Sequence, residues 1–415
     1  MLDKAGIRQL AYVVKVDAIE PIAGKDRVEA AVIGGWRTMV RKGLFEPGDL
    51  GIYIEIDSKA PETEPFEFLS KYHYKIKTQK FKNFYSQGLL MHPSDFGWEV
   101  TNDMMPMGII DDKGDVHFAE GEERFLTKQL GITYAVAEDN KRKAPSVDKY
   151  KKMAQRHPEL FKKNWARWMM KREWGKKVMF FFFGKARDKR SGWPSWVVKT
   201  DEERVQNMPW VFENPDWSEY EWIATEKIDG TSTTFTLKRG KGLHKDEFYV
   251  CSRNVCFDKP EKEDKCYYES NVYLEMAQKY NVEDVLKTML KADKNLEFVT
   301  LQGETYGDGI QKRTYSLGKG EHRFKAFNLI YGYKDGARRC NPVEMTHILD
   351  AYKIPCVPII AEIYKLPLDC DTLLLQAVGN SLVDGLPREG IVFRDRRGER
   401  SFKAVSNEFL MEYHG

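Results

Sequence analysis

The sequence Thr225-Glu226-Lys227-Ile228-Asp229-Gly230-Thr231 places a lysine and an aspartate two residues apart and closes the group with a glycine. It lies between two stretches rich in β-branched and aromatic residues, Trp222–Ala224 and Thr233–Leu237. Such residues favour strands, so the pattern predicts two strands joined by a short turn that holds the lysine. A lysine fixed in this way would face a cleft, but Lys-Gly turns are also common on surfaces. The pattern K-x-D-G alone leaves both interpretations open.

The composition is typical of a globular intracellular protein. With 415 residues, two or three domains are expected. Hydrophobic residues make up 42% and charged residues 31%, and no apolar run is long enough to span a bilayer. The longest such run, Val178–Phe183, predicts a buried strand at most, and strands should resume there. The start, Met1–Gly6, lacks the features of a secretion signal, so we expect an intracellular location without membrane association.

The charge is unevenly distributed along the chain. The net charge is only +3, from 66 basic and 63 acidic residues. Residues 141–190 hold 18 Lys and Arg against 4 Asp and Glu, a local charge of +14, which leaves −11 for the remainder. This segment is a candidate surface for a polyanion. The six cysteines form no C-x-x-C pair, so we expect free buried thiols and neither disulfides nor a zinc site.

The first part of the chain alternates apolar and polar residues over short stretches separated by Gly and Pro turns. The predicted strands cover residues 11–16, 28–33, 37–40 and 50–56. Four or five short strands at this spacing indicate a small β-barrel.

Basic and aromatic residues interleave in the later stretch Lys75–Tyr85. Basic side chains suit phosphates, and aromatic rings offer faces on which bases stack. A nucleic-acid contact that includes Lys75, Lys77 and Lys80 is one interpretation. The solvated edge of an amphipathic strand is the other.

A basic helical segment follows. Residues 100–140 contain Asp and Gly turns, and residues 146–177 show a helical pattern with Trp165, Trp168 and Trp174 among many Lys and Arg. This pattern predicts either a basic helical arm or a solvated helix that covers the barrel.

These patterns divide the chain into three parts. We predict a barrel over residues 1–100, a basic and partly helical connector over 101–175, and a large α+β domain over 176–415. Within the last part, helical periodicity at Val272–Leu290 and around Met345–Ala351 predicts scaffold helices without chemistry of their own.

Downstream of Lys227, further strands or strand ends each carry one side chain suited to bind a nucleotide. They are Arg253, Glu304, Phe327, Glu389 and Lys403. A base needs an aromatic face, ribose hydroxyls need a carboxylate, phosphates need Lys or Arg, and a divalent metal needs carboxylate oxygens. Phe327, Glu304, Arg253 with Lys403, and Glu389 supply these in turn. Each residue taken singly is also explained as core or solvated surface, and their order behind K-x-D-G favours the nucleotide site.

This ordered set resembles the covalent nucleotidyltransferase superfamily of ATP-dependent ligases and RNA capping enzymes. The forms Ser252-Arg253-Asn254, Glu304-Thr305-Tyr306-Gly307, Lys325-Ala326-Phe327-Asn328 and Glu389-Gly390-Ile391-Val392-Phe393-Arg394 are similar to those of RNA ligases. The sequence extends 12 residues past Lys403, so we expect no C-terminal OB domain of the kind that DNA ligases and capping enzymes carry. With a barrel in front instead, the chain looks most like the Naegleria-type RNA ligases, RNA ligase family 5.

The resemblance implies an α+β fold, with an N-terminal OB-like β-barrel followed by a nucleotidyltransferase domain of antiparallel sheets and helices. It implies an ATP-dependent RNA ligase that uses Mg²⁺ or Mn²⁺ and seals 3′-OH and 5′-phosphate ends. The expected path runs through lysyl-AMP and an AMP-capped RNA 5′ end. We expect a monomer that acts on nicked or duplex RNA, although the sequence does not distinguish these from broken tRNA or single-stranded ends.

The resemblance also implies the roles of individual residues. Lys227 is the nucleophile, and Lys403 and Asp229 assist catalysis. The expected nucleotide-binding residues are Glu226, Arg253, Glu304, Phe327 and Lys403, and the expected metal-binding residues are Glu389 and Asp229, through water. The expected RNA contacts are Arg204 and Asn207, in a polar segment before the nucleophile, with Lys75, Lys77 and Lys80.

Two features depart from the family pattern, and other classes of protein remain open. Residues 100–175 have no counterpart in the family, and Val405 stands where a second basic residue is often found. A DNA ligase or a GTP-using capping-type guanylyltransferase would use the same lysine. A non-catalytic nucleic-acid-binding protein would explain the barrel and the basic connector but would leave the ordered clusters unexplained.

Overall fold

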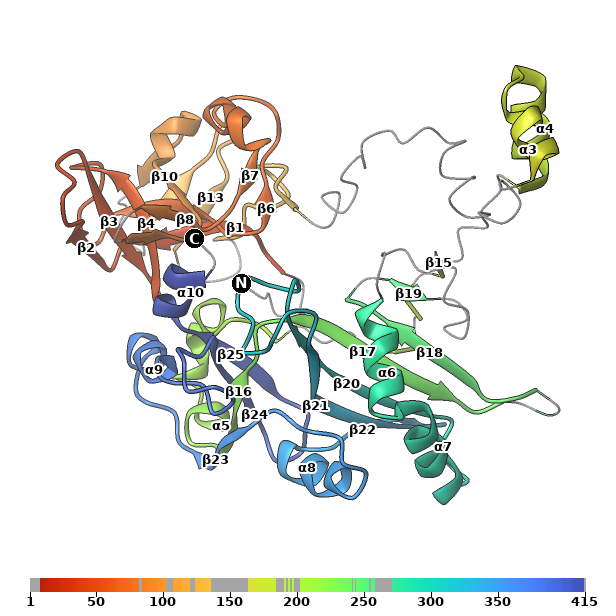
Figure 1. The fold of residues 1–415 in the computed structure, drawn as a ribbon. Coiled ribbons are helices and arrows are strands. Elements are labelled where there is room, and N and C mark those ends of the chain that lie inside the picture. Colours follow the sequence, from red (N-terminus) through yellow and green to blue (C-terminus); the bar gives the residue numbers. More distant parts are fainter. Residues whose placement is uncertain are drawn as a thin grey trace.

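A computed structural model of the chain describes residues 8–81, 84–101, 107–119, 124–135, 163–183, 190–191, 193–194, 196–197, 202–240, 242, 244–253, 255–257 and 271–413. Figure 1 shows an N-terminal domain of short strands above a larger domain of sheets and helices. The predicted α+β architecture, with the barrel first, is therefore confirmed. Among the described residues, no helix combines the length and the apolar character needed to cross a membrane.

The N-terminal domain is built from short antiparallel strands at the predicted positions. They are β1 (Ala11–Lys15), β2 (Ala18–Pro21), β3 (Val28–Ile33), β4 (Trp36–Arg41), β5 (Leu50–Ile54), β6 (Ser58–Lys59), β7 (Lys75–Ile76), β8 (Gln79–Phe81), β9 (Phe84–Ser86) and β10 (Leu89–Met91). Two short 3₁₀ helices, η1 (Glu67–Tyr72) and η2 (Pro93–Phe96), connect some of them. β5 pairs with β1 and β10, and β3 pairs with β2 and β4.

Alternate residues of β1 face two different hydrophobic clusters. Tyr12 packs in the cluster shared with β3 and β4, and Val13 packs in a second cluster on the other face. This second cluster includes Ile109 and Ile132, which lie beyond the predicted barrel boundary near residue 100. The four additional strands are β11 (Glu99–Thr101), β12 (Gly108–Ile110), β13 (Val116–Phe118) and β14 (Thr133–Tyr134). Because both faces of β1 are apolar, they need a second layer, which the described residues up to Ala135 supply.

Two helices follow, α3 (Asn164–Met170) and α4 (Glu173–Phe183). They confirm the second half of the predicted helical segment, and its first half lies in residues 136–162, outside the described residues. The predicted strand at Val178–Phe183 is wrong, because these residues continue α4. A short apolar run has no periodicity that separates a strand from a helix, and no Gly or Pro interrupts the chain between Lys176 and Phe183.

The C-terminal domain contains two antiparallel sheets. The seven-stranded sheet has the order β15-β19-β18-β17-β20-β21-β22, and the four-stranded sheet has the order β23-β16-β24-β25. The strands of the first are β15 (Arg190–Ser191), β17 (Thr231–Lys238), β18 (Glu247–Cys251), β19 (Cys256–Phe257), β20 (Phe298–Gly307), β21 (His322–Tyr333) and β22 (Gly336–Arg339). Those of the second are β16 (Trp222–Lys227), β23 (Ile359–Tyr364), β24 (Gly390–Arg394) and β25 (Ser401–Val405).

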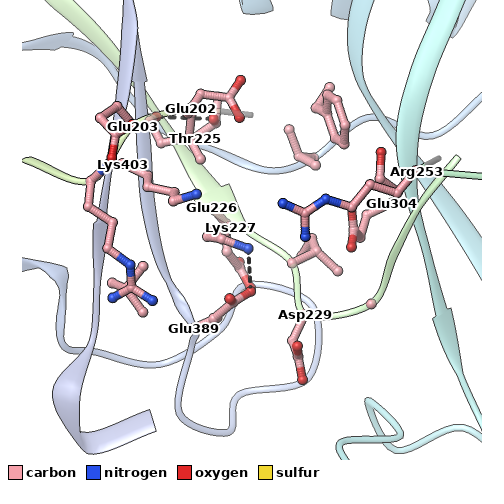
Figure 2. A pocket seen from close by; sticks show the side chains of 18 of the residues that line it. Glu202, Glu203, Thr225, Glu226, Lys227, Asp229, Arg253, Glu304, Glu389 and Lys403 are labelled. Atoms are coloured by element: carbon pink, nitrogen blue, oxygen red, sulfur yellow. Dashed lines mark hydrogen bonds and ion pairs between the residues drawn. The ribbon is translucent and has the colours of Figure 1, made fainter. Parts of the chain in front are cut away.

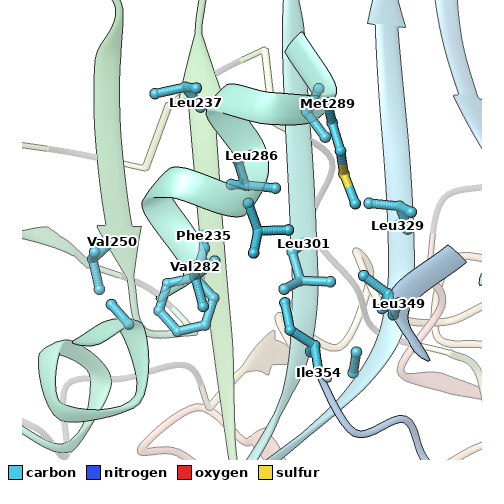
Figure 3. Packing of buried hydrophobic residues seen from close by; sticks show 14 of the residues in the cluster. Phe235, Leu237, Val250, Val282, Leu286, Met289, Leu301, Leu329, Leu349 and Ile354 are labelled. Carbon is cyan, nitrogen blue, oxygen red and sulfur yellow. The ribbon is translucent and has the colours of Figure 1, made fainter. Parts of the chain in front are cut away.

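The seven-stranded sheet is covered on one face by α6 (Val272–Lys279), α7 (Val282–Ala292) and α8 (Pro342–Asp350), which confirms the predicted scaffold helices. Figure 3 shows Leu286 and Met289 of α7 packed toward Leu301 and Leu329 of the sheet. Burying each such side chain contributes roughly 1.5–3 kcal/mol. This core holds β20 and β21 in fixed positions beneath the cavity described below.

The four-stranded sheet buries one face in a separate cluster that includes Trp222, Phe393 and Phe402. The helices that cover it or lead into it are η5 (Val205–Asn207), η6 (Pro209–Val211), α5 (Pro215–Ser218) and α9 (Cys370–Ala377). The final helix, α10 (Asn407–Tyr413), contacts the N-terminal domain, where the Tyr85 hydroxyl donates to the carbonyl of Leu410. The sequence patterns did not predict α9 or α10, which are short.

Candidate active site

Lys227 lies where the chain passes from one sheet to the other. It is the last residue of β16, and the turn Ile228–Gly230 leads to β17. The prediction had placed the lysine within the turn itself. Although β16 and β17 are consecutive, they belong to different sheets. Gly230 allows this crossing because a Cβ atom there would lie 2.3 Å from the carbonyl oxygen of Thr305 on β20.

A cavity of about 430 Å³ lies between the two sheets, and Lys227 borders it. The strand alternation of the four-stranded sheet explains its polar wall. Phe393 and Phe402 face the apolar cluster, and their neighbours in sequence face the cavity. These neighbours include Arg394 on β24 and Lys403 on β25. Val392 pairs with both Thr225 and Lys403, which places Lys403 on the same face as Lys227.

The opposite wall comes from the seven-stranded sheet and supplies Glu304 and Phe327. Phe327 sits at a β-bulge, where the register between β20 and β21 shifts. Phe324 packs in the core on the far face. Ile228 and Val357 line the cavity near Phe327, and the Arg394 guanidinium carbon lies 5.8 Å from the Phe327 ring centroid. This corner of the cavity is suited to a flat heterocyclic base.

Lys227 is held by an ion pair in this ligand-free state. Its Nζ donates to Glu389 Oε2 at 2.8 Å, and Figure 2 shows this contact with Asp229 and Glu304 nearby. Burial lowers the pKa of the lysine, but the charges of Glu389 and Glu304 outweigh burial and raise it above its ordinary value. Lys227 is therefore protonated and not yet nucleophilic at neutral pH.

The pKa of Glu304 is also raised, but here burial is a cause of the increase and not an opposing influence. Burial, together with the charges of Glu389 and Asp229, raises the pKa of Glu304 to about 8, although Lys227 and Arg253 oppose this. The turn beside it is fixed because the Asp229 backbone N–H donates to the Tyr315 hydroxyl at 2.7 Å.

The segment that precedes β16 crosses the end of β25. The Lys403 backbone N–H donates to the carbonyl of Glu203 at 2.8 Å, and Arg204 forms a parallel bridge with Lys403. Glu202 accepts from Arg394 Nη2 at 2.5 Å. Burial raises the pKa of Glu202, but Arg394 and Lys403 lower it more, so the carboxylate stays ionised beside this basic group.

The N-terminal domain also contributes to the cavity, which the sequence did not predict. Arg8, Asp57 and Tyr134 line it together with Arg204. The Arg8 guanidinium lies 5.2 Å from the Tyr134 ring centroid and 3.0 Å from Glu55. A signal for Asp57 existed, since this carboxylate follows directly on the apolar stretch 50–56. Nothing in the sequence pointed to Arg8 or Tyr134.

Two predicted site residues occupy places that differ from their expected roles. Glu226 borders the cavity, but its carboxylate accepts from the Ser381 hydroxyl and from the Leu382 backbone N–H at 2.8 Å. It thereby anchors the loop that leads to Glu389. Asn207 is fully buried and its amide donates to Glu203, which lines the cavity. The burial of this side chain explains why a polar segment packs here, and its contact with RNA stays a prediction.

The structure brings together Lys227, Asp229, Arg253, Glu304, Phe327, Glu389, Lys403 and Arg204 around one cavity. It does not bring Lys75, Lys77 or Lys80 there. The Lys80 ammonium donates to the carbonyl of Met411 in α10, so this lysine joins the two domains.

The carboxylates fit a hydrated divalent metal better than a dry metal site. Among the described residues, no group of three or more His, Cys, Asp and Glu side chains is arranged to hold a metal ion. Magnesium keeps several waters and needs one or two protein carboxylates, which Glu389 and Asp229 could supply in this cavity. Among the described cysteines, Cys251, Cys256 and Cys340 are buried as predicted, Cys356 and Cys370 are half-buried, and Cys266 lies outside the described residues.

Comparisons with known proteins agree with this arrangement. Residues 220–405 match the RNA ligase family model, and residues 10–93 match an OB-fold domain model. A search of curated protein sequences found no match. Structures of Naegleria gruberi RNA ligase share the fold over 98% of this chain and 99% of theirs. A mutant with AMP and Mn gives a TM-score of 0.64 at 23% identity, and the ligase with PPi gives 0.63 at 24%. Residues 220–405 therefore form a domain of the RNA ligase family, and an OB-fold domain precedes it in the chain.

Proposed function

We propose that the chain is an ATP-dependent RNA ligase that joins 3′-OH and 5′-phosphate ends through a lysyl-AMP intermediate on Lys227. The observation that carries this proposal is the position of Lys227 at the seam of the cavity. An aromatic ring and a carboxylate, Phe327 and Glu304, lie on one wall, and basic side chains lie on the other. A nucleotide placed with its base on Phe327 and its ribose at Glu304 would direct its phosphates toward Lys227 and Lys403. The solved relative with ATP and Mn supports ATP as the nucleotide.

The proposed reaction has three steps that share this site. The Lys227 amine attacks the α-phosphorus of ATP, forming a P–N bond and breaking the P–O bond to pyrophosphate. An oxygen of the RNA 5′-phosphate then attacks the same phosphorus and returns the P–N electron pair to Lys227. Finally, the RNA 3′-oxygen attacks the 5′-phosphate and releases AMP, which completes the phosphodiester. These are mainly problems of positioning and of neutralising charge.

The chain's own residues prepare the first step. Arg253, Lys403 and Arg204 border the cavity and supply positive charge for the phosphates. Lys227 must lose its proton before attack, and the ion pair to Glu389 opposes that loss. Any interaction that draws Glu389 away leaves burial as the dominant influence and lowers the lysine pKa. A divalent cation, when bound, offsets phosphate charge, and Glu389 with Asp229 would hold it through water.

Labelling with radioactive nucleotide tests the first step. The full-length protein, incubated with α-³²P-ATP and Mg²⁺ or Mn²⁺, should acquire an acid-labile covalent label. Lys227→Ala should abolish the label, whereas Lys287→Ala, a surface lysine on α7, should leave it unchanged. Labelling from GTP and not from ATP would contradict the proposal in favour of a capping-type enzyme. An absence of label from both would contradict the covalent mechanism.

Sealing assays then test the substrate. Full-length protein should join nicked or duplex RNA that carries 3′-OH and 5′-phosphate ends, and Lys227→Ala should not. Matched DNA duplexes and RNA with 3′-phosphate ends should remain unsealed. Efficient sealing of DNA strands would contradict the choice of RNA.

A further inference from the structure

The helical pair α3–α4 presents tryptophans that the fold of either domain does not use. Trp165, Trp168 and Trp174 are 50%, 50% and 54% exposed. Figure 1 shows the two helices standing apart from both domains, and none of the hydrophobic clusters found among the described residues includes them. Large exposed aromatic rings that cluster in this way usually mark an interaction surface.

The two helices contact each other through small side chains and through one pair of rings, Trp168 on α3 and Trp174 on α4. Ala166 on α3 and Met179 on α4 are almost completely buried. Gly175 lets the helices approach closely, because a Cβ atom there would lie 2.1 Å from the carbonyl oxygen of Met169. The close approach of the helices at Gly175 leaves about half of each tryptophan exposed, including the two that contact each other.

Basic side chains share the exposed face with the tryptophans. The Arg172 guanidinium carbon lies 3.7 Å from the Trp168 ring centroid, and Trp168 meets Trp174 edge to face at 6.0 Å. Trp174 and Lys177, three residues apart on α4, are both exposed on one side of the helix. Residues 163–177 contain six Lys and Arg against one Glu. This surface combines positive charge with stacking faces.

We propose that the α3–α4 pair is a binding site for single-stranded RNA, separate from the active site, in which unpaired bases stack on the tryptophans. Arginine and lysine beside aromatic rings suit a single strand, because phosphates need charge and every base has a face that stacks. A helix that lies on a membrane surface instead separates its basic side chains from its apolar ones. The choice of RNA as the polyanion rests on the proposed ligase function.

The test compares full-length variants in two assays. Trp165→Ala, Trp168→Ala and Trp174→Ala are combined, and Phe68→Ala serves as the control because Phe68 is 53% exposed on the N-terminal domain. The Kd for a fluorescein-labelled single-stranded RNA should rise by about 10-fold or more in the triple variant, since each stacked base contributes substantially, with a smaller rise for duplex RNA. Phe68→Ala should bind like wild type. An unchanged single-strand Kd in the triple variant would overturn the proposal.

Wild-type protein provides a second measurement that does not depend on how the variant folds. RNA with 5-iodouridine, crosslinked by light, should become attached to the tryptophans of peptides from residues 163–177. Crosslinks confined to other segments would overturn the proposal. Binding to phosphatidylserine vesicles that is lost in the triple variant, without such crosslinks, would also overturn the proposal, in favour of a lipid surface.

Adenylylation separates this inference from the proposed function. The triple tryptophan variant should label Lys227 from ATP as wild type does, because the helices do not line the cavity. Lys227→Ala should lose the label and keep the affinity for RNA that the α3–α4 pair provides. If wild-type protein acquired no label, the ligase mechanism would be refuted. The Kd values for RNA and the crosslinks would then still decide whether the α3–α4 pair binds RNA.

Discussion

Glu389→Gln is expected to lower the pKa of Lys227 in the ligand-free protein. The substitution keeps the shape of the side chain and removes the charge that holds Nζ at 2.8 Å. The two side chains are 24% and 11% exposed, so the effective dielectric lies between that of water and that of a protein surface site. At that distance the attraction is about 1.5 kcal/mol for ε of ~80 and ~6 kcal/mol for ε of ~20. Removing this attraction should therefore lower the pKa of Lys227, because burial then acts against a weaker opposing charge.

Competitive labelling with acetic anhydride measures this pKa directly. Protein free of nucleotide and treated with a chelator is labelled over a range of pH, and mass spectrometry follows the peptide that contains Lys227. Lys287 provides an internal reference, because its own partners Glu283 and Asp284 are unchanged. Glu304→Gln should lower the Lys227 pKa less than Glu389→Gln does, since Glu304 is the weaker of the two influences.

An unchanged or higher Lys227 pKa in Glu389→Gln would refute this account. It would mean that burial, and not the ion pair, sets the protonation of the nucleophile. Adenylylation is no substitute for this measurement, because Glu389 is also proposed to hold a metal. A variant can therefore have a more reactive free amine and still form less lysyl-AMP.

Three further outcomes are expected. The folded protein raises the pKa of Glu304 to about 8, above that of an unfolded glutamate, so Glu304 favours the folded state at low pH and loses this contribution as pH rises toward 8. In Glu304→Gln, the fall in Tm between about pH 4.5 and 8 should therefore become shallower. An unchanged slope of Tm against pH would contradict the raised pKa. Gly230→Ala should lower both Tm and adenylylation, because the new Cβ meets the Thr305 carbonyl at 2.3 Å; wild-type labelling would argue against a fixed turn. Asn207→Ala should cost roughly 1–3 kcal/mol in denaturant unfolding, because it removes a buried amide and its hydrogen bond to the Glu203 carboxylate, while RNA affinity stays unchanged; weaker RNA binding by folded protein would support the predicted contact.

Local patterns predicted most of the strands and the composition of the cavity. Strand alternation is a local property, so the order of Lys227, Glu304, Phe327, Glu389 and Lys403 along successive strands could be read from the sequence. That these side chains meet around one cavity was expected only from the resemblance to RNA ligases. Spacing in the sequence cannot predict it, because it depends on how two sheets face each other.

Contacts made at long range were beyond such patterns. Arg8 and Tyr134 reach the cavity because the N-terminal domain packs beside it, and no local signal reports that packing. The second hydrophobic cluster, around Ile109, packs on one of the two apolar faces of β1. The apolar residues of β1 are equally compatible with a strand in the wall of one barrel, so they did not predict this second cluster. The helix through Val178–Phe183 was mistaken for a strand because four consecutive phenylalanines have no period.

The passage of the chain from one sheet to the other at Ile228–Gly230 has a mechanical consequence. The proposed contacts for base and ribose lie on β20 and β21, and Lys403 for the phosphates lies on β25 of the facing sheet. A nucleotide that made these contacts would therefore bridge the two sheets close to the residues at which the chain passes between them. Because Arg8 and Asp57 border the same cavity, a change in the separation of the two sheets would also alter the contacts of the N-terminal domain there.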